Sequence, residues 1–169
     1  MKLTKFFVGF FAVAAMALTT SCLSSKEGPE VVSTPTMGQT TVTKASISNS
    51  GTTVSATTEA GTTATANITA AEVAGLSSDA DVTLTVQNVG EAVSVTLTSS
   101  DDSQATIPGG GVEVKLSGLE ANTSYTLDDG STVVTDAQGN ATVTVKSFGK
   151  PVTLTKKTTP SHSGGQGQN

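Results

Sequence analysis

Side chains that could act as a nucleophile, a base or a metal ligand are few in this chain and far apart in the sequence. The one cysteine, Cys22, directly follows an apolar run, and the one histidine, His162, lies in a Gly- and Ser-rich C-terminal stretch. Ser-His-Asp and Cys-His catalysis need a base held by packing beside its nucleophile, and a zinc site usually needs several His or Cys ligands. We therefore expect no catalytic residues, no metal site and no cofactor.

Carboxylates are the remaining candidates for chemistry. Five acids stand at turn signals: Asp101, Asp102, Asp128, Asp129 and Asp136. Carboxylates of this kind can bind Ca²⁺ between loops, and a carboxylate pair can hydrolyse glycosides. No D-x-D-x-D-G spacing is present, and the only aromatic residues beyond the apolar N-terminal run are Tyr125 and Phe148. We interpret these acids as solvated turn residues and expect the protein not to be an enzyme.

The N-terminal residues have the pattern of an export signal. Lys2 and Lys5 supply a basic start, and the apolar run at residues 6–18 has the length of a secretory signal's hydrophobic region. It is shorter than the ~20 residues needed to span a bilayer. The small residues before Cys22 resemble the lipobox of bacterial lipoproteins, in which the Cys is acylated. Leu18 lies four positions before the Cys, one more than the family's usual spacing.

This start resembles that of Bacteroidota-type lipoproteins, many of which carry Lys and acidic residues just after the Cys as a surface-export signal. Lys26 and Glu27 match that signal in part. The resemblance implies a signal peptide at residues 1–21, a lipid such as palmitate on Cys22, and a flexible tether at residues 22–38. We expect the protein at the outer membrane or cell surface, with the membrane as its partner through the lipid anchor.

An ordinary signal-peptidase site is the alternative, because Ala15-Met16-Ala17 fits the A-x-A pattern. Cleavage there would leave Cys22 as a free thiol near the new N-terminus, which is a redox liability in an exported protein. With no second Cys, the folded part has no internal disulfide. These considerations favour lipidation of Cys22.

Composition restricts the partners. The net charge is −5, only 14% of the residues are charged, and no Lys/Arg cluster is present, which argues against nucleic acid as a partner. Sugar-binding surfaces usually stack rings on exposed aromatics, and protein-binding hot spots favour Trp, Tyr and Arg, so the scarcity of aromatics weakens both classes. Residues 158–169 are too polar and Gly-rich to pack, and we expect a disordered tail there.

The middle of the chain consists of short alternating runs of Thr, Val, Ala and Ser. Apolar residues recur two apart with Thr, Ser or a charged residue between them, which is the period of a half-buried strand. The clearest runs lie at residues 82–87, 92–97, 112–116, 124–127, 141–145 and 151–156, and weaker ones at residues 41–48, 52–57 and 63–69. Gly, Asn and Asp at the breaks supply turn chemistry.

Strands at this spacing indicate an antiparallel sandwich rather than a parallel sheet. We expect one all-β sandwich over residues 39–157, while a split into two modules near residues 108–111 stays open. Thr69 lies three positions before Glu72, a capping-box spacing, so we also expect a single helical turn at residues 69–75.

Two motifs carry a resemblance to Ig-like folds. Residues 118–125, GLEANTSY, resemble the G-L-x-P-x-T-x-Y segment of fibronectin type III and related Ig-like domains, with Ala121 where that family prefers Pro. The resemblance implies that the Tyr125 hydroxyl bonds back to upstream backbone, as in a tyrosine corner. Residues 135–142, TDAQGNAT, are similar to the T-D-x-x-G-x-A hairpin of bacterial Ig-like and prealbumin-like surface modules. Together they imply an Ig-like β-sandwich.

Such folds host many functions, so the fold cannot assign one. Our hypothesis is a non-enzymatic cell-envelope lipoprotein that presents the sandwich for adhesion, spacing or assembly. One alternative is a component of a nutrient-uptake system that binds a glycan or protein ligand. A less favoured alternative is a β-pore-forming protein, because residues 52–69 alternate Ser and Thr with small apolar residues as membrane hairpins do.

Overall fold

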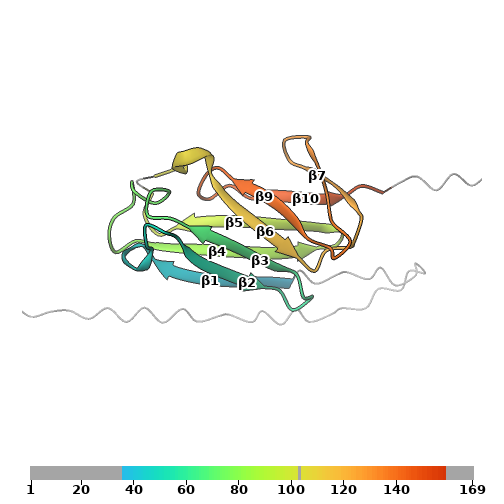
Figure 1. The fold of residues 1–169 in the computed structure, drawn as a ribbon, viewed down its shortest axis with the longest axis horizontal. Helices are drawn as coiled ribbons and strands as arrows, with labels where there is room; N and C mark the ends of the chain where they lie inside the picture. Colours follow the sequence, from blue (N-terminus) through green and yellow to red (C-terminus); the bar gives the residue numbers. More distant parts are fainter. Residues whose placement is uncertain (1–35, 103, 159–169) are drawn as a thin grey trace, which may run out of the picture. The chain divides into compact units, whose positions relative to one another are not determined.

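The computed structural model describes residues 36–102 and 104–158, which form two packed β-sheets (Figure 1). The strands are β1 (Thr36–Thr43), β2 (Thr52–Thr57), β3 (Thr63–Ile68), β4 (Asp81–Val89), β5 (Ala92–Ser99), β6 (Val112–Ser117), β7 (Ser124–Leu127), β8 (Thr132–Val134), β9 (Ala141–Val145) and β10 (Val152–Lys156). One sheet has the order β1-β4-β5-β10-β7-β8, the other β2-β3-β6-β9, and the paired strands are antiparallel. The expected antiparallel all-β sandwich is confirmed.

The two-residue period of the sequence places the apolar side chains between the sheets. In β4, Val82, Leu84 and Val86 are at most 1% exposed, whereas Thr83 and Thr85 between them are half-buried on the outer face. The same alternation holds in β5, β6 and β9. Full burial of a Val or Leu side chain contributes about 1.5–3 kcal/mol, so these inward rows supply most of the driving force for folding.

The observed strands agree with the alternating runs of the sequence and depart from the predicted elements at two places. The first strand begins at Thr36, inside the segment expected to be tether, because Met37 and Gly38 continue the pairing of β1 with β4. Strand β8 was not expected. It has three residues, Thr132–Val134, and follows a turn so closely that no alternation can be read in it.

The described residues form a single sandwich. Residues 108–110 form a short 3₁₀ turn, η2 (Pro108–Gly110), and the strands after it share both sheets with the strands before it, since β10 pairs with β5 and β6 pairs with β3. No sub-boundary near residues 108–111 divides this part of the chain. The expected signal peptide, Cys22, most of the tether and His162 lie outside the described residues.

The helical turn expected at residues 69–75 is instead a series of three successive tight turns that ends at Leu76. The Glu72 carboxylate accepts the Thr69 N–H at 2.7 Å, as in a capping box, and the Ala74 N–H donates to the Ala71 carbonyl at 3.4 Å. The buried amide of Gln104 then donates to the Glu72 carbonyl at 2.6 Å and accepts the Gly75 N–H at 2.7 Å. Because a side chain from another loop occupies these backbone groups, the segment does not continue as a helix.

One side of the sandwich is closed by β1 and β2, which come from different sheets. The Thr40 hydroxyl donates to the Ser55 carbonyl at 2.5 Å, and a Cβ placed on Gly38 would overlap the carbonyl oxygen of Thr57. The backbones therefore approach each other at Gly38 more closely than any side chain would permit. This contact covers the edge of β2 that would otherwise be open.

Replacing Gly38 with Ala is expected to lower the free energy of unfolding by at least ~2 kcal/mol, because the new methyl group must push β1 away from β2. Gln39→Ala is the matched control, since Gln39 is the next residue in β1 and is exposed. Urea denaturation of the two variants measures the difference. Equal midpoints for Gly38→Ala and wild type would show that the two strands can separate freely.

Candidate functional site

A network of side-chain hydrogen bonds lies at two corners of the sandwich. One corner joins β6 to β7 at residues 118–123, and the other joins β8 to β9 at residues 135–140. Tyr125, at 4% exposure, lies beneath the first corner, and its hydroxyl oxygen accepts the Glu120 backbone N–H at 3.4 Å. The bond of Tyr125 to upstream backbone that the motif implied is therefore present. Ala121 lies where the resembling segment has Pro, so the backbone of this corner is less restricted than Pro would make it.

Thr135 joins the two corners. Its side chain is buried, and its hydroxyl donates to the Glu120 carbonyl at 2.6 Å while accepting the Thr123 N–H at 2.9 Å. The Thr135 backbone N–H also donates to the Thr123 carbonyl at 3.0 Å. The Thr135 side chain thus satisfies backbone groups on a loop twelve residues away. These hydrogen bonds hold that loop in place over Tyr125.

Asp136 shapes the second corner. Its carboxylate accepts the N–H groups of Gln138 at 2.9 Å and Asn140 at 2.8 Å, and the Asn140 amide at 2.9 Å. These bonds, led by the Asn140 backbone N–H, lower the pKa of the Asp136 carboxyl. The turn that resembles the T-D-x-x-G-x-A hairpin does not join two paired strands here, because β8 pairs with β7 and β9 pairs with β6, so it crosses from one sheet to the other.

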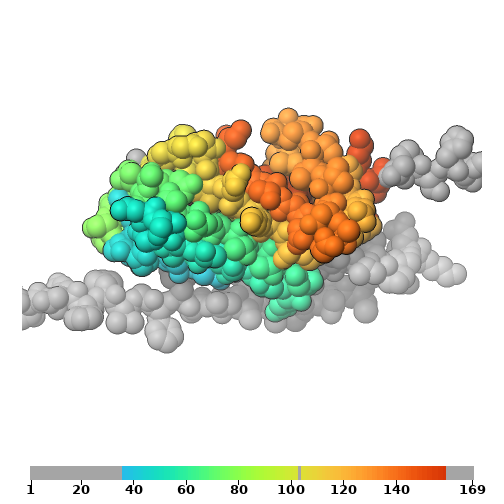
Figure 2. Space-filling model, viewed as in Figure 1, coloured from blue at the N-terminus to red at the C-terminus, as the bar shows by residue number. Residues whose placement is uncertain are grey.

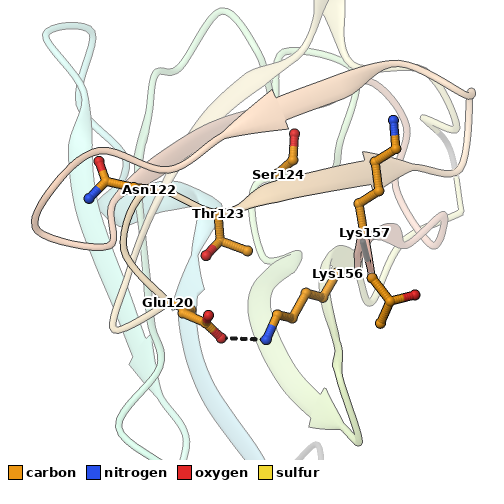
Figure 3. Close-up of a pocket in the computed structure, with 7 residues that line it drawn as sticks. Glu120, Asn122, Thr123, Ser124, Lys156 and Lys157 are labelled. Atoms are coloured by element: carbon orange, nitrogen blue, oxygen red, sulfur yellow. Dashed lines mark hydrogen bonds and ion pairs between the residues drawn. The ribbon is translucent and has the colours of Figure 1, made fainter. Parts of the chain in front are cut away.

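An open depression of about 570 Å³ lies beside the first corner, residues 118–123, and is drawn in Figure 3. Glu120 and Lys156 point toward one another there, with Lys156 Nζ 2.6 Å from Glu120 Oε2. The hydrogen bond from Lys156, reinforced by its charge, lowers the pKa of the Glu120 carboxyl, and the same bond raises the pKa of Lys156. Asn122, Thr123 and Lys157 line the rest of the depression.

A second depression, of about 320 Å³, lies on the other side of the same ion pair. Its lining includes Tyr125 and Asn88, and the Asn88 amide donates to the buried Thr62 hydroxyl at 2.8 Å. The ion pair, the amide and the hydroxyls of the two depressions could hydrogen-bond a polar ligand such as a sugar or a peptide. We take this pair of depressions as the candidate binding site.

The acids singled out in the sequence are spread over separate turns. Asp101 accepts the N–H and hydroxyl of Ser77 at 2.6 and 2.5 Å, and Asp128 accepts the Thr153 N–H at 2.8 Å. Asp129 accepts the Ser131 hydroxyl at 2.5 Å, which lowers its pKa, and Asp102 is exposed. Among the described residues no three His, Cys, Asp or Glu side chains gather as a metal site would require.

The Thr-rich hairpin considered for pore formation consists of β2 and β3, six residues each. Its apolar side chains are buried in the core, among them Val54, Ala64 and Ile68. A membrane-spanning strand needs about 9–11 residues with a lipid-facing apolar side, whereas each of these strands has six residues and directs its apolar side chains into the core. Of the helices in the described part of the chain, none is long and apolar enough to cross a membrane.

Comparison with known proteins yields no relative: no family model matches the chain, no curated protein matches its sequence, and no solved structure matches its fold.

Several residues of this site were not identified from the sequence. Glu120 lies in the motif of residues 118–125, but its partner Lys156 is 36 positions away. Thr135 opens the second motif, yet nothing in the motif shows that its hydroxyl reaches Glu120. Only the Tyr125 hydroxyl could be placed beforehand, because its motif specifies a local hydrogen bond.

Thr135→Val should lower the free energy of unfolding by roughly 2–3 kcal/mol, because the isosteric side chain leaves the Glu120 carbonyl and the Thr123 N–H without their buried partner. Thr135→Ser keeps the hydroxyl and should lose much less. Denaturant unfolding of the two variants compares them directly. A Val variant that loses less stability than the Ser variant would show that the methyl group, and not the hydrogen bonds, holds the corners together.

The lowered pKa of Glu120 should return to the ordinary carboxyl range in Lys156→Met, whereas Lys157→Met should leave it low. Because the pKa of Glu120 is lowered and that of Lys156 is raised, the ion pair stabilises the fold at neutral pH. Its contribution is lost as pH falls through the Glu120 pKa or rises through the Lys156 pKa. NMR titration of the Glu120 carboxyl carbon measures both variants. An unchanged Glu120 pKa in Lys156→Met would contradict the pairing.

Proposed function

We propose that this chain is a non-enzymatic lipoprotein of the cell envelope that presents its β-sandwich for adhesion, spacing or assembly. The observation that carries the proposal is the chemistry of the outer faces, where most outward positions of both sheets are Thr, Ser or another uncharged polar residue. Figure 2 shows the side of the sandwich formed by the four-stranded sheet. Broad faces of this kind suit contact with another macromolecule better than chemistry on a small substrate.

The hydroxyl groups on these faces form cross-strand pairs. On the four-stranded sheet, the hydroxyls of Ser55 and Thr65 lie 2.9 Å apart, and those of Thr57 and Thr63 also lie 2.9 Å apart. Paired hydroxyls satisfy each other across the strands and order the surface. Such a face is wettable, yet it carries little charge that must be desolvated on contact.

Lipidation of Cys22 supplies the anchor in this proposal. With residues 23–35 as a flexible coil, the sandwich would stand about 20 Å from the lipid, and at most ~45 Å away with the coil fully extended. Two or three acyl chains, at about 0.8 kcal/mol per buried CH₂, would make the attachment effectively permanent. On a tether of this length, the sandwich would make its contacts close to the membrane that holds it.

A ligand-binding component of a nutrient-uptake system is the second candidate. The two depressions that flank the Glu120–Lys156 ion pair favour it, because they bring an amide, hydroxyls and opposite charges together at one end of the sandwich. A glycan or peptide array probed with wild type and Lys156→Met separates the two candidates. Ligand binding that is lost in Lys156→Met would favour uptake, and the absence of any array ligand would favour the contact module.

Protease treatment of intact cells tests the proposal, with wild type and Cys22→Ala compared by immunoblot and by a palmitate label. The wild type should be labelled, membrane-bound and cleaved from outside, and Cys22→Ala should be unlabelled and recovered in soluble fractions. Ser21→Ala, a change beside the modified residue, is the matched control and should behave as wild type.

A labelled but protease-protected wild type would place the sandwich inside the envelope and rule out adhesion to other cells. An unlabelled wild type would mean that cleavage occurs after Ala17 and that no lipid anchor exists.

A further inference from the structure

The outer face of the six-stranded sheet differs from the rest of the surface. Its outward side chains on β1, β4, β5 and β10 form rows that run across the strands. In one row, Gln39 lies beside Thr85 and Thr85 beside Thr96; in the next row, Ser94 of β5 lies beside Thr153 of β10. We call the outward positions of these four strands, from Met37 on β1 to Thr155 on β10, the hydroxyl face. It lies on the opposite side of the sandwich from the four-stranded sheet.

The hydroxyl face is almost free of charge. Within the described strands that form it, the only charged outward residue is Asp81, at the end of β4, and its carboxylate accepts the Thr43 hydroxyl at 3.0 Å. The outer face of the four-stranded sheet, by contrast, carries Glu113 and Lys115 on its third strand. Protein surfaces ordinarily intersperse charges of both signs, which keep equal surfaces apart.

The same face holds exposed apolar side chains. Met37 is 57% exposed and Val89 is 51% exposed, and they lie on the adjacent strands β1 and β4 near the same end of the sheet. Beside Val89 a depression of about 390 Å³ is lined by Ala92, Thr96 and Pro151 among others. The two exposed apolar side chains and the hollow beside them give this face apolar area that a partner could remove from water.

Some hydroxyls of this face already have partners within it. Thr41 and Thr83 pair their hydroxyls at 2.8 Å, and the Thr43 hydroxyl donates to Asp81 at 3.0 Å, so covering these groups leaves none of them without a hydrogen bond. The Thr side chains otherwise present methyl groups, which gain from being removed from water. A partner that brings charges would lose their hydration without finding counter-charges here, so the fitting partner is itself uncharged and flat.

We propose that the hydroxyl face is the contact surface of a homodimer, in which it packs face to face against the same face of a second copy. Four strands about 4.8 Å apart, with outward residues every ~6.7 Å, offer roughly 500 Å² per copy. Two copies would bury about 1,000 Å², the lower bound for a specific interface and more than most lattice contacts. The pairing is isologous and closes at two copies.

The homodimer is one form of the assembly role proposed above. It rests on that proposal in one respect, which is that both copies are anchored in the same membrane. Two sandwiches tethered to one membrane have an effective concentration of the order of mM, so an interface too weak to hold in dilute solution can form there. Because Asp81 at the end of β4 is the one charged side chain among the described residues of the face, the contact should depend little on salt. Sheets packed in this way lie about 10 Å apart, within the reach of a short cross-linker.

Cross-linking of the full-length protein in intact cells with a short bismaleimide tests the proposal. Thr96→Cys places a thiol at the middle of the hydroxyl face, and Thr65→Cys places one at the middle of the opposite face as the matched control. Both residues are half-buried Thr on central strands. We expect a species of twice the monomer mass from Thr96→Cys, equal at low and high salt, and none from Thr65→Cys or wild type.

Adding Thr85→Lys to Thr96→Cys should reduce the dimer yield at least ~tenfold, because two like charges would face each other across the interface. Thermal unfolding of the double variant should match that of Thr96→Cys, which separates lost contact from lost fold. Equal yields from Thr96→Cys and Thr65→Cys, an unaffected yield with Thr85→Lys, or a cross-linked product that contains another protein would each overturn the homodimer.

The palmitate and protease experiment on the same cells keeps the two failures apart. A labelled, protease-sensitive protein without cross-linked dimer would overturn the homodimer and leave the proposed function standing. An unlabelled protein would overturn the anchor whether or not the dimer forms.

Discussion

The close packing of two sheets over a core of small and β-branched side chains is the constraint on which the rest of this structure depends. The core consists of Val, Leu, Ile and Ala, with Tyr125 as its one fully enclosed aromatic residue in the described part of the chain. Such a core cannot fill a wide gap, so the sheets must approach each other closely. At Gly38 this approach reaches backbone against backbone, and the fold tolerates no side chain there.

Close sheets leave the connecting loops little room, and polar side chains tie these loops to one another. Lys44 donates to the carbonyls of Ala74 and Leu76 at one end of the sandwich, where Gln104 also binds the turn of residues 70–75. At the other end, Thr135 and Asp136 hold the two corners. Each bond satisfies a backbone group that neither sheet can pair, so the loops are ordered without hydrophobic bulk.

The sequence allowed the strands to be predicted well because a strand is a local property. Alternation over five or six residues decides which side faces the core, and β7 and β9 coincide with their predicted runs. β8 could not be predicted in this way, because three residues show no period and its place depends on pairing with β7. The turn of residues 69–75 was misjudged for a similar reason, since Gln104 decides it from a separate loop.

The candidate site was less predictable than the fold. Tyr125 was placed correctly because its partner, Glu120, lies five residues upstream within one motif. The Glu120–Lys156 ion pair depends on the pairing of β10 with β7, which brings the last strand beside the corner. The T-D motif did not show which strands its turn joins, because a tight turn looks the same in sequence whether it joins neighbouring strands or crosses between sheets. Sheet membership is set by contacts along the whole chain.

Threonine reconciles the requirements that this surface must meet. Its β-branched carbon suits the pleated sheet, its hydroxyl keeps the face wettable, and its methyl group leaves something to bury on contact. Charged residues would give more solubility but would cost desolvation in any interface. Binding hot spots usually consist of Trp, Tyr and Arg, and this chain has few aromatic and few charged residues. Its surface is therefore better suited to broad contacts, in which many residues each contribute little binding energy. Weak contacts become effective when the partners share one membrane, so surface chemistry of this kind and a lipid anchor complement each other.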